Sequence, residues 1–191
     1  MVAAVDPLTR LAYGARAGDA ADLEAFVEAA YGQVWQLCRS LVDDQNADDL
    51  AQETFIRAVR TLPRFRGDAS ARTWLLAIAR HACMDELRAR SRRRRRDASL
   101  VASATADERT APDAGEEIGV ADLVRRLDPD RRAAFVLTQL LGLSYEETAR
   151  VCECPVGTIR SRVARARADL LALLADGRLS QRAPYRGTSS S

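Results

Sequence analysis

The feature that most constrains this chain lies near its C-terminal end, where residues 144–167 predict two helices joined by a tight turn. Ser144 and Glu147 fit a capping box, in which each side chain bonds a free backbone amide of the first helical turn. Pro155 cannot continue that helix, but it suits the start of a second one. The segment is therefore typical of a helix-turn-helix, a unit that places its second helix in the major groove of DNA.

The second of these helices has two distinct faces. Apolar residues recur at three- and four-residue steps and predict a buried stripe made of Val156, Ile159, Val163, Ala166, Leu170, Leu171 and Leu174. Arg160, Ser161 and Arg165 fall off that stripe, and a guanidinium group fits guanine edges or phosphate oxygens. By itself the segment leaves a simpler interpretation open, an amphipathic helix whose basic face is merely solvated.

Charge is segregated along the chain rather than uniform. All 29 basic residues are arginine, and 27 acidic residues leave a net charge of only +2 among 191 residues. We therefore expect local basic patches instead of a polycation. Apolar runs are too short for a membrane span or a signal-peptide core, so we expect a cytoplasmic protein with no membrane contact.

Side chains that commonly carry chemistry are sparse. The chain has a single histidine, His81, and four cysteines, Cys38, Cys83, Cys152 and Cys154. In a cytoplasmic protein we expect these cysteines to be small buried hydrophobic residues rather than disulfide partners. A tetrahedral zinc site would need ligands from distant segments. With no nucleophile, acid–base pair or phosphate-binding loop in sight, we expect no metal, no cofactor and no catalytic residue.

Three helical segments are predicted before residue 92, which indicates an all-α fold. The first runs from about Ala20 to Leu41, and the third from about Ser70 to Arg90 after the loop at 63–70. The second starts near Asn46, a good capping residue, with acidic residues in its first turn where the helix dipole favours them. Its buried face is predicted to consist of Leu50, Phe55, Ala58, Val59 and Leu62.

The composition changes after an arginine run at 92–96, since the following residues are small, polar and acidic. A second helical unit follows, with helices predicted at 120–127 and 129–141, the latter capped by Asp128. We expect two small helical domains joined by a flexible linker. The expected parts are an N-terminal segment at 1–19, a first domain at 20–96, an acidic linker at 97–118, a second domain at 119–176 and a disordered tail at 177–191.

Three segments together resemble a known family. These are ADDLAQETFIRA at 47–58, PRFRGDASARTWLLAIARHACMDELR at 63–88 and LGLSYEETARVCECPVGTIRSRVARAR at 141–167. They resemble, in order and separation, the bacterial RNA polymerase sigma factors of the extracytoplasmic-function group, within the sigma-70 family, and most of all the compact actinobacterial sigma-C-like type. The resemblance covers roughly residues 20–175. It implies a subunit that directs promoter-specific initiation by recognising minus-35 and minus-10 elements.

The resemblance also implies partners. Asp48, Asp49, Gln52 and Glu53 match the segment that docks on the clamp helices of the largest subunit of core RNA polymerase. Carboxylates can pair there with arginines of a partner, although Asp48 and Asp49 also suit the start of their own helix. The second domain would meet the flap region of polymerase. Family members are commonly held off by an anti-sigma factor, but nothing in this sequence identifies one.

Residues 65–85 match the part of the family that opens and reads the minus-10 element. The loop residues Phe65, Arg66, Gly67 and Asp68 correspond to the site that receives a base flipped from the non-template strand, which needs polar edges and stacking surface. On the following helix the matching residues are Arg80, His81 and Asp85, with His81 standing where many members carry asparagine. Trp74 is expected in the core rather than as a stacking platform.

The remaining matches concern minus-35 recognition and the DNA backbone. Arg160, Ser161 and Arg165 are the expected base or backbone readers, and Thr158, Arg162 and Arg167 are expected on phosphates. Seven arginines in nine residues at 88–96 suit phosphate neutralisation. Arg88, Arg92 and Arg93 are the expected backbone contacts there, the alternative being a solvated run.

Glu153 departs from the pattern of many helix-turn-helix units, which have glycine in the turn. If its φ is positive, it costs on the order of 1 kcal/mol. Cys152 and Cys154 would then point inward and clamp the turn.

Two other classes of function were weighed. An ordinary helix-turn-helix regulator would act without polymerase, and it would have no use for the motifs at 47–88. A helical adaptor with incidental basic faces would show no salt-dependent DNA binding. The acidic linker fits either a segment threaded toward the RNA exit channel, as in the family, or a mere tether.

Overall fold

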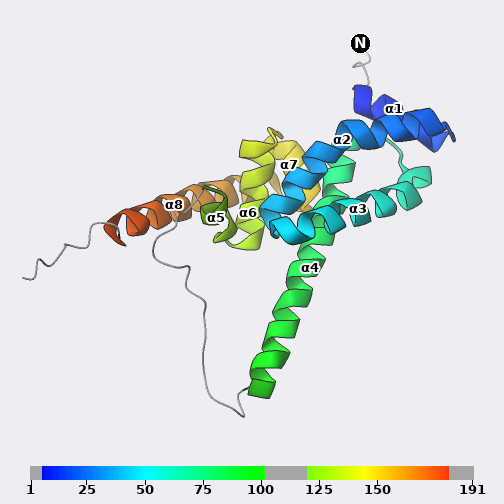
Figure 1. The fold of residues 1–191 in the computed structure, drawn as a ribbon. Helices are drawn as coiled ribbons and strands as arrows, with labels where there is room; N and C mark the ends of the chain where they lie inside the picture. Colours follow the sequence, from blue (N-terminus) through cyan, green and yellow to red (C-terminus); the bar gives the residue numbers. More distant parts are fainter. Residues whose placement is uncertain (1–5, 102–119, 181–191) are drawn as a thin grey trace, which may run out of the picture.

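Figure 1 shows a computed structural model of the chain, which describes residues 6–101 and 120–180. Within these ranges every regular element is a helix, in agreement with the predicted all-α class. The N-terminal unit contains α1 (Pro7–Arg16), α2 (Ala20–Leu41), α3 (Asp44–Thr61), the 3₁₀ turn η1 (Leu62–Arg64) and α4 (Ala71–Val101). The C-terminal unit contains α5 (Val120–Arg125), α6 (Pro129–Phe135), the π-helical turn η2 (Val136–Leu140), α7 (Tyr145–Cys152) and α8 (Val156–Ser180).

Helix starts are set largely by aspartate caps. Asp128 accepts from the backbone amides of the first turn of α6, as predicted. The predicted cap of α3 at Asn46 is wrong, because Asp43 holds that position. The Asp43 carboxylate accepts from the Asn46 amide at 2.9 Å and from its side-chain nitrogen at 2.7 Å, so the helix begins at Asp44. α1 lies in the segment 1–19, where no helix was predicted.

α4 and α8 are longer than predicted. α4 continues to Val101, into the expected linker, and Figure 1 shows its last turns standing clear of the other helices. Arginine is a good helix former, and Glu86 accepts from Arg90 at 2.7 Å and from Arg93 at 3.0 Å. α8 continues to Ser180. The rest of the expected linker, and the expected tail from 181 on, lie outside the described residues. In the described part, neither these helices nor any other is long and apolar enough to cross a membrane.

The core of the N-terminal unit lies between α2, α3 and α4, whose inward faces bury Phe26, Leu37, Leu41 and Leu75 almost completely. Val59 does not join them. It is 43 % exposed, so its predicted place in the core is wrong. The reason is helical geometry, since Phe55 and Ala58 of α3 and Leu62 of η1 already fill the inward side, and position 59 falls on the outer side of α3.

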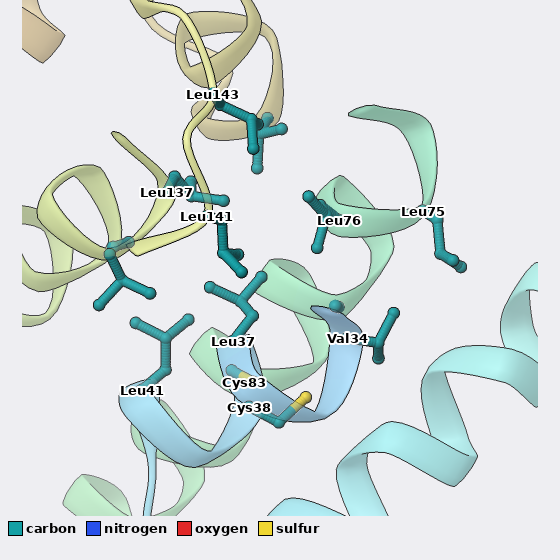
Figure 2. Packing of buried hydrophobic residues seen from close by; sticks show 14 of the residues in the cluster. Val34, Leu37, Cys38, Leu41, Leu75, Leu76, Cys83, Leu137, Leu141 and Leu143 are labelled. Carbon is teal, nitrogen blue, oxygen red and sulfur yellow. The ribbon is translucent and has the colours of Figure 1, made fainter. Parts of the chain in front are cut away.

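One hydrophobic cluster runs without interruption from the N-terminal unit into the C-terminal unit. Figure 2 shows Leu137 of η2 and Leu141, which follows η2, facing Leu37 of α2, with Leu76 of α4 across from them. All four side chains are buried. Burial of leucine is worth roughly 2 kcal/mol per side chain, so buried apolar contacts, as well as polar bonds, hold the two units together.

Two arginines also join the two units, because each donates a hydrogen bond to a backbone carbonyl of the other unit. The buried Arg132 of α6 donates to the carbonyl of Leu41 at 2.6 Å and to that of Leu127 at 2.9 Å. Burial lowers the pKa of Arg132. These carbonyls satisfy part of its guanidinium at the end of α2, while its Nε atom has no partner among the described residues. From the other side, Arg72 of α4 donates to the carbonyl of Leu141. Each unit therefore reaches across the boundary into the backbone of the other.

The four cysteines are all free thiols. Cys38, Cys83 and Cys152 are buried, as predicted, and Cys154 is half-buried. Cys38 and Cys83 lie side by side in the core (Figure 2), and the hydrogen bond between them, together with burial, raises the pKa of Cys83. The buried thiols therefore pack as small hydrophobic groups, and the raised pKa makes Cys83 a poor nucleophile.

Candidate nucleic-acid interface

α7 and α8 form the predicted helix-turn-helix. The capping box at its start is complete, since the Glu147 amide donates to Ser144 Oγ at 3.1 Å and the Ser144 amide donates to Glu147 Oε2 at 2.8 Å. α8 begins at Val156, directly after Pro155. The local signals in the sequence thus place both helix starts correctly.

The turn between these helices is left-handed at Glu153, with φ 52° and ψ 46°. Among the described residues, Glu153 is the one non-glycine residue with positive φ. The conformation lets the Cys154 amide donate to the Ala149 carbonyl at 3.1 Å, which closes the end of α7. Cys152 points inward as predicted, and burial raises its pKa to about 11. Cys154 is only half-buried, and its Sγ atom accepts a hydrogen bond from Arg162 Nη1 at 3.6 Å.

α8 presents most of its predicted DNA-contacting residues to solvent. Of the predicted buried stripe, Leu171 and Leu174 are 67 % and 42 % exposed, so their predicted burial is wrong. Ile159, Val163 and Ala166 are buried against the rest of the unit. The opposite side is open, and the exposed members are Arg160, Ser161, Arg165 and Arg167. Thr158 is half-buried at the first turn, and its carbonyl accepts from Ser161 Oγ at 2.9 Å. Arg160 and Arg165 therefore have unobstructed guanidinium groups on the outward face of the helix.

Arg162 is placed differently from its neighbours on α8. It donates to Asp130 Oδ2 at 2.8 Å, and Arg80 of α4 donates to the other oxygen of the same carboxylate at 2.8 Å. The Arg80 side chain is only 10 % exposed, and its Nε atom has no partner. In this arrangement both guanidinium groups are bound by Asp130, and that of Arg80 is largely removed from solvent.

The loop at 65–70 encloses a cavity of about 270 Å³ at the surface of the N-terminal unit. Its lining consists of residues 64–69 and the side chains of Thr73, Trp74, Ala77 and Arg150. Arg66 and Asp68 stand at the rim, each 84 % exposed, with 3.6 Å between Arg66 Nε and Asp68 Oδ2. The cavity therefore combines an aromatic wall with one basic and one acidic group at its mouth.

Two aromatic rings form the inner part of this cavity. Phe65 is 4 % exposed. The centre of its ring lies 5.6 Å from that of Tyr13 and 5.1 Å from that of Trp74. Trp74 packs against the core as predicted, yet it also faces the cavity and is only half-buried. Of these rings Trp74 is therefore the one available for stacking, while the predicted contact residue Phe65 supports it from behind.

His81 and Asp85 lie further along α4. His81 is half-buried, and its Nε2 atom lies 3.4 Å from Glu153 Oε2 of the helix-turn-helix turn. Asp85 is exposed and forms two long ion pairs. Its Oδ2 atom lies 3.8 Å from Arg57 Nη1, and its Oδ1 atom lies 3.4 Å from Arg88 Nη1. The turn that connects the two helices of the C-terminal unit thus rests on the α4 face predicted to read the minus-10 element.

The predicted DNA-backbone residues Arg88, Arg92 and Arg93 are exposed on the projecting part of α4. Arg93 shares the Glu86 carboxylate with Arg90. Arg90 itself is held by Asp43, and although burial opposes its charge, the hydrogen bonds to Asp43 and Glu86 raise its pKa. Arg90 therefore braces α4 against the start of α3, while its neighbours point into solvent.

Comparison with known proteins matches both units to one family. Residues 26–93 match the model of the family described as Sigma-70 region 2, and residues 119–170 match that of Sigma-70, region 4. Over 168 residues the chain is 48% identical to a protein of Mycobacterium tuberculosis (strain CDC 1551 / Oshkosh) named "ECF RNA polymerase sigma factor SigC", which covers 87% of this chain and 91% of the relative. The chain belongs to the extracytoplasmic-function group of sigma-70 family sigma factors.

Solved structures agree with this assignment. CnrH, in complex with the cytosolic domain of CnrY, matches with a TM-score of 0.67 and 27% identity over 90% of this chain and 99% of that chain. The sigma factor RpoE of Bartonella quintana, in complex with the anti-sigma factor NepR, matches with a TM-score of 0.62 and 27% identity over 81% of this chain and 97% of that chain.

Membership in the family determines the activity. A sigma factor directs promoter-specific transcription initiation by RNA polymerase and is not an enzyme. The alternative of a helix-turn-helix regulator that acts without polymerase is not favoured, because region 2 accounts for residues that such a regulator lacks.

The predicted polymerase-docking residues of this sigma factor fall into two pairs. Asp49 and Gln52 are exposed, and neither side chain bonds any other described residue. Asp48 instead accepts from Trp35 Nε1 at 2.8 Å, and Glu53 accepts from Arg57 at 2.7 Å. The structure therefore leaves the first pair open for a partner and uses the second pair within the N-terminal unit.

Sequence reasoning missed the apolar part of this surface. Ile56 and Val59 are 46 % and 43 % exposed. Both follow Asp49 and Gln52 on the same side of α3 at helical spacing. The signal was available, because an apolar residue on the polar side of an amphipathic helix indicates a contact surface.

Proposed function

We propose that this sigma factor reads a promoter at two points, with α8 at the minus-35 element and the cavity at 65–70 with the adjoining part of α4 at the minus-10 element. The cavity carries the proposal. A base that leaves the duplex needs a stacking surface and polar groups at its edges. Trp74 provides the surface, and Arg66 and Asp68 provide the edge groups, so one side of the base and its phosphate can be held together.

The proposed minus-35 contact uses the outward side of α8. Arg160 and Arg165, with Ser161 between them, are the proposed base or backbone readers, and Thr158 and Arg167 support them on phosphates. The exposed arginines Arg88, Arg92 and Arg93 would add phosphate contacts along α4. These phosphate contacts predict that the affinity for promoter DNA falls steeply as the salt concentration rises, because every neutralised phosphate releases counterions.

Core RNA polymerase is the proposed partner of both units. Asp49 and Gln52, with the exposed Ile56 and Val59, form the proposed contact with the clamp helices of the largest subunit. The C-terminal unit exposes Leu140, Leu171 and Leu174, which supports a contact of that unit with the flap region. The proposed place of action is the cytoplasm, where RNA polymerase and the chromosome are found.

The proposed DNA contacts require the two units to separate. Arg80 and Arg162 are held by Asp130, His81 lies against Glu153, and Arg150 of α7 lines the cavity at 65–70. DNA cannot reach these groups while the units are packed as they are here. Two surfaces on polymerase that each bind one unit would supply the energy of separation.

An anti-sigma factor is the further proposed partner. Both solved neighbours were determined in complexes, with CnrY in one case and with the anti-sigma factor NepR in the other. A protein that binds the packed arrangement of the two units would hold this sigma factor in the form that cannot contact DNA. Co-purification from cells, followed by identification of the bound protein, tests for it.

Reconstituted transcription tests the proposal as a whole. Core polymerase with this chain should give transcripts from promoters mapped after overexpression. Arg66→Ala with Asp68→Ala should reduce open-complex formation, detected as permanganate-reactive thymines, more than it reduces binding to core. Equal open-complex formation by the variant and the wild type would contradict the role of the cavity.

A further inference from the structure

α1 lies outside the region matched by the family models and packs against α2, η1 and the start of α4. Its first contact is with α4. The hydroxyl of Thr9, held by Asp6 at 2.5 Å, accepts from the Ala71 amide at 2.8 Å in a buried site. The first free amide of α4 is thereby satisfied by a side chain of α1. The start of α4 directly follows the loop at 65–70, so α1 fixes one end of that loop.

The next two contacts of α1 are with the loop itself. Arg16 Nη1 donates to the carbonyl of Phe65 at 2.6 Å, and the Tyr13 hydroxyl donates to the carbonyl of Arg66 at 3.4 Å. The Tyr13 ring also packs against that of Phe65, and the Arg16 guanidinium lies 5.6 Å from the centre of the Tyr13 ring. Two consecutive loop carbonyls are thus held from outside the cavity by one helix.

Gly67 follows these two carbonyls and shows how tightly the loop is fitted to α1. Its φ is +79°, which side chains rarely adopt, and a Cβ atom there would lie 1.8 Å from the Tyr13 hydroxyl oxygen. A side chain at position 67 would therefore meet two separate obstacles, the backbone conformation and Tyr13.

We propose that α1 is a brace for base capture, in which Tyr13 and Arg16 are positioning residues that hold the loop at 65–70 in the shape that forms the cavity. The inference rests on the proposed function of that cavity. Neither side chain lines the cavity, so their effect on DNA passes through the loop backbone. A loop ordered before DNA arrives does not have to lose its conformational entropy when the base binds.

The decisive experiment compares two single-stranded minus-10 oligonucleotides bound to holoenzyme, one intact and one abasic at the captured position. Arg16→Ala should weaken binding of the intact oligonucleotide by about tenfold, the effect of losing one charge-assisted hydrogen bond. It should leave the abasic oligonucleotide, affinity for core polymerase and minus-35 duplex binding unchanged. Arg16→Lys, which keeps a donor, should recover part of the loss.

Arg10→Ala is the matched control. Arg10 is an exposed arginine of the same helix with no hydrogen bond to the loop, so its loss should leave both oligonucleotides bound as in the wild type. Equal weakening of the intact and abasic oligonucleotides by Arg16→Ala would overturn the brace. If the wild type itself binds both oligonucleotides equally, the proposed cavity function fails first, and the two failures are thereby distinguished.

A second comparison keeps the fold of α1 intact. Tyr13→Phe, which loses the hydroxyl bond to the Arg66 carbonyl, should weaken binding of the intact oligonucleotide by about twofold, the low end for one neutral hydrogen bond, and leave binding of the abasic one unchanged. Tyr13→Phe retains the ring against Phe65, so it does not unfold the helix. If Tyr13→Phe binds the intact oligonucleotide as tightly as the wild type does, the Tyr13 hydroxyl does not hold the loop for base capture, and the positioning role of Tyr13 fails.

Discussion

Arg80 of α4 and Arg162 of α8 share one carboxylate, that of Asp130, each at 2.8 Å from its own oxygen. The two arginines come from the two units, and both were predicted to contact DNA. A carboxylate between two guanidinium groups imitates the way a phosphate would be held. The carboxylate that joins the units therefore occupies two residues that were predicted to contact promoter DNA.

Asp130→Asn should loosen the packing of the two units. Arg80 is largely buried and would lose its charged partner, which costs on the order of 1 kcal/mol after allowance for the half-exposed carboxylate. Hydrogen exchange should rise in α4 around Arg80 and in α7. Asp169→Asn, which removes a partner of Arg131 inside the C-terminal unit, is the control and should leave α4 unchanged. Equal exchange in α4 for both variants would count against the role of Asp130.

Glu153→Gly should raise the free energy of unfolding by up to about 1 kcal/mol, because glycine adopts the left-handed turn without strain. The variant also loses the pair between Glu153 and His81, but that pair is exposed and contributes little to the free energy of unfolding. Glu153→Ala removes the same carboxylate but keeps the strain, so it should give no gain. Urea unfolding of both variants measures the difference, and an equal gain from alanine would show that strain is not the cause.

Asp49→Arg should weaken binding to core polymerase by roughly 1–3 kcal/mol, since a carboxylate facing partner arginines becomes a like charge. Glu24→Arg makes the same charge reversal at an exposed position of α2 and should change affinity little. Competition with a labelled sigma factor for core enzyme gives both values. Identical affinities for the two variants would mean that Asp49 lies outside the docking surface.

Arg160→Ala should cost roughly 1–3 kcal/mol at the cognate minus-35 site if the side chain reads a base edge. The loss should then be smaller on an altered sequence. Arg126→Ala, at an exposed arginine directly after α5, is the control for general charge. Equal losses by Arg160→Ala on all sequences would identify a phosphate contact instead of a base contact.

Much of the site could be predicted because its signals are local. The capping box at Ser144 and Glu147, the break at Pro155 and the outward direction of Arg160 follow from residues within a few positions of one another. The left-handed turn at Glu153 was anticipated in the same way. The extent of α4 was not, because a run of arginines predicts both a helix and a solvated tail equally well.

Residues whose roles depend on distant partners were predicted less well. Val59 fits a helical apolar pattern, yet it is exposed, because the inward side of α3 is already filled. Phe65 matches a base-capture motif, yet it is buried behind Trp74 by α1. No local pattern in residues 7–16 indicates that Tyr13 and Arg16 reach a loop about fifty residues away.

The sequence by itself determined the all-α class, most of the helices, the capping box at the start of α7, the family and the residue types of each interface. Backbone hydrogen bonding and side-chain periodicity act over a few residues, so these properties depend on short stretches of the sequence. Only the tertiary structure decided that Arg80 and Arg162 meet at Asp130, and that α1 supports the loop at 65–70. Those contacts depend on which surfaces bury each other, and burial is a property of the whole chain rather than of any segment.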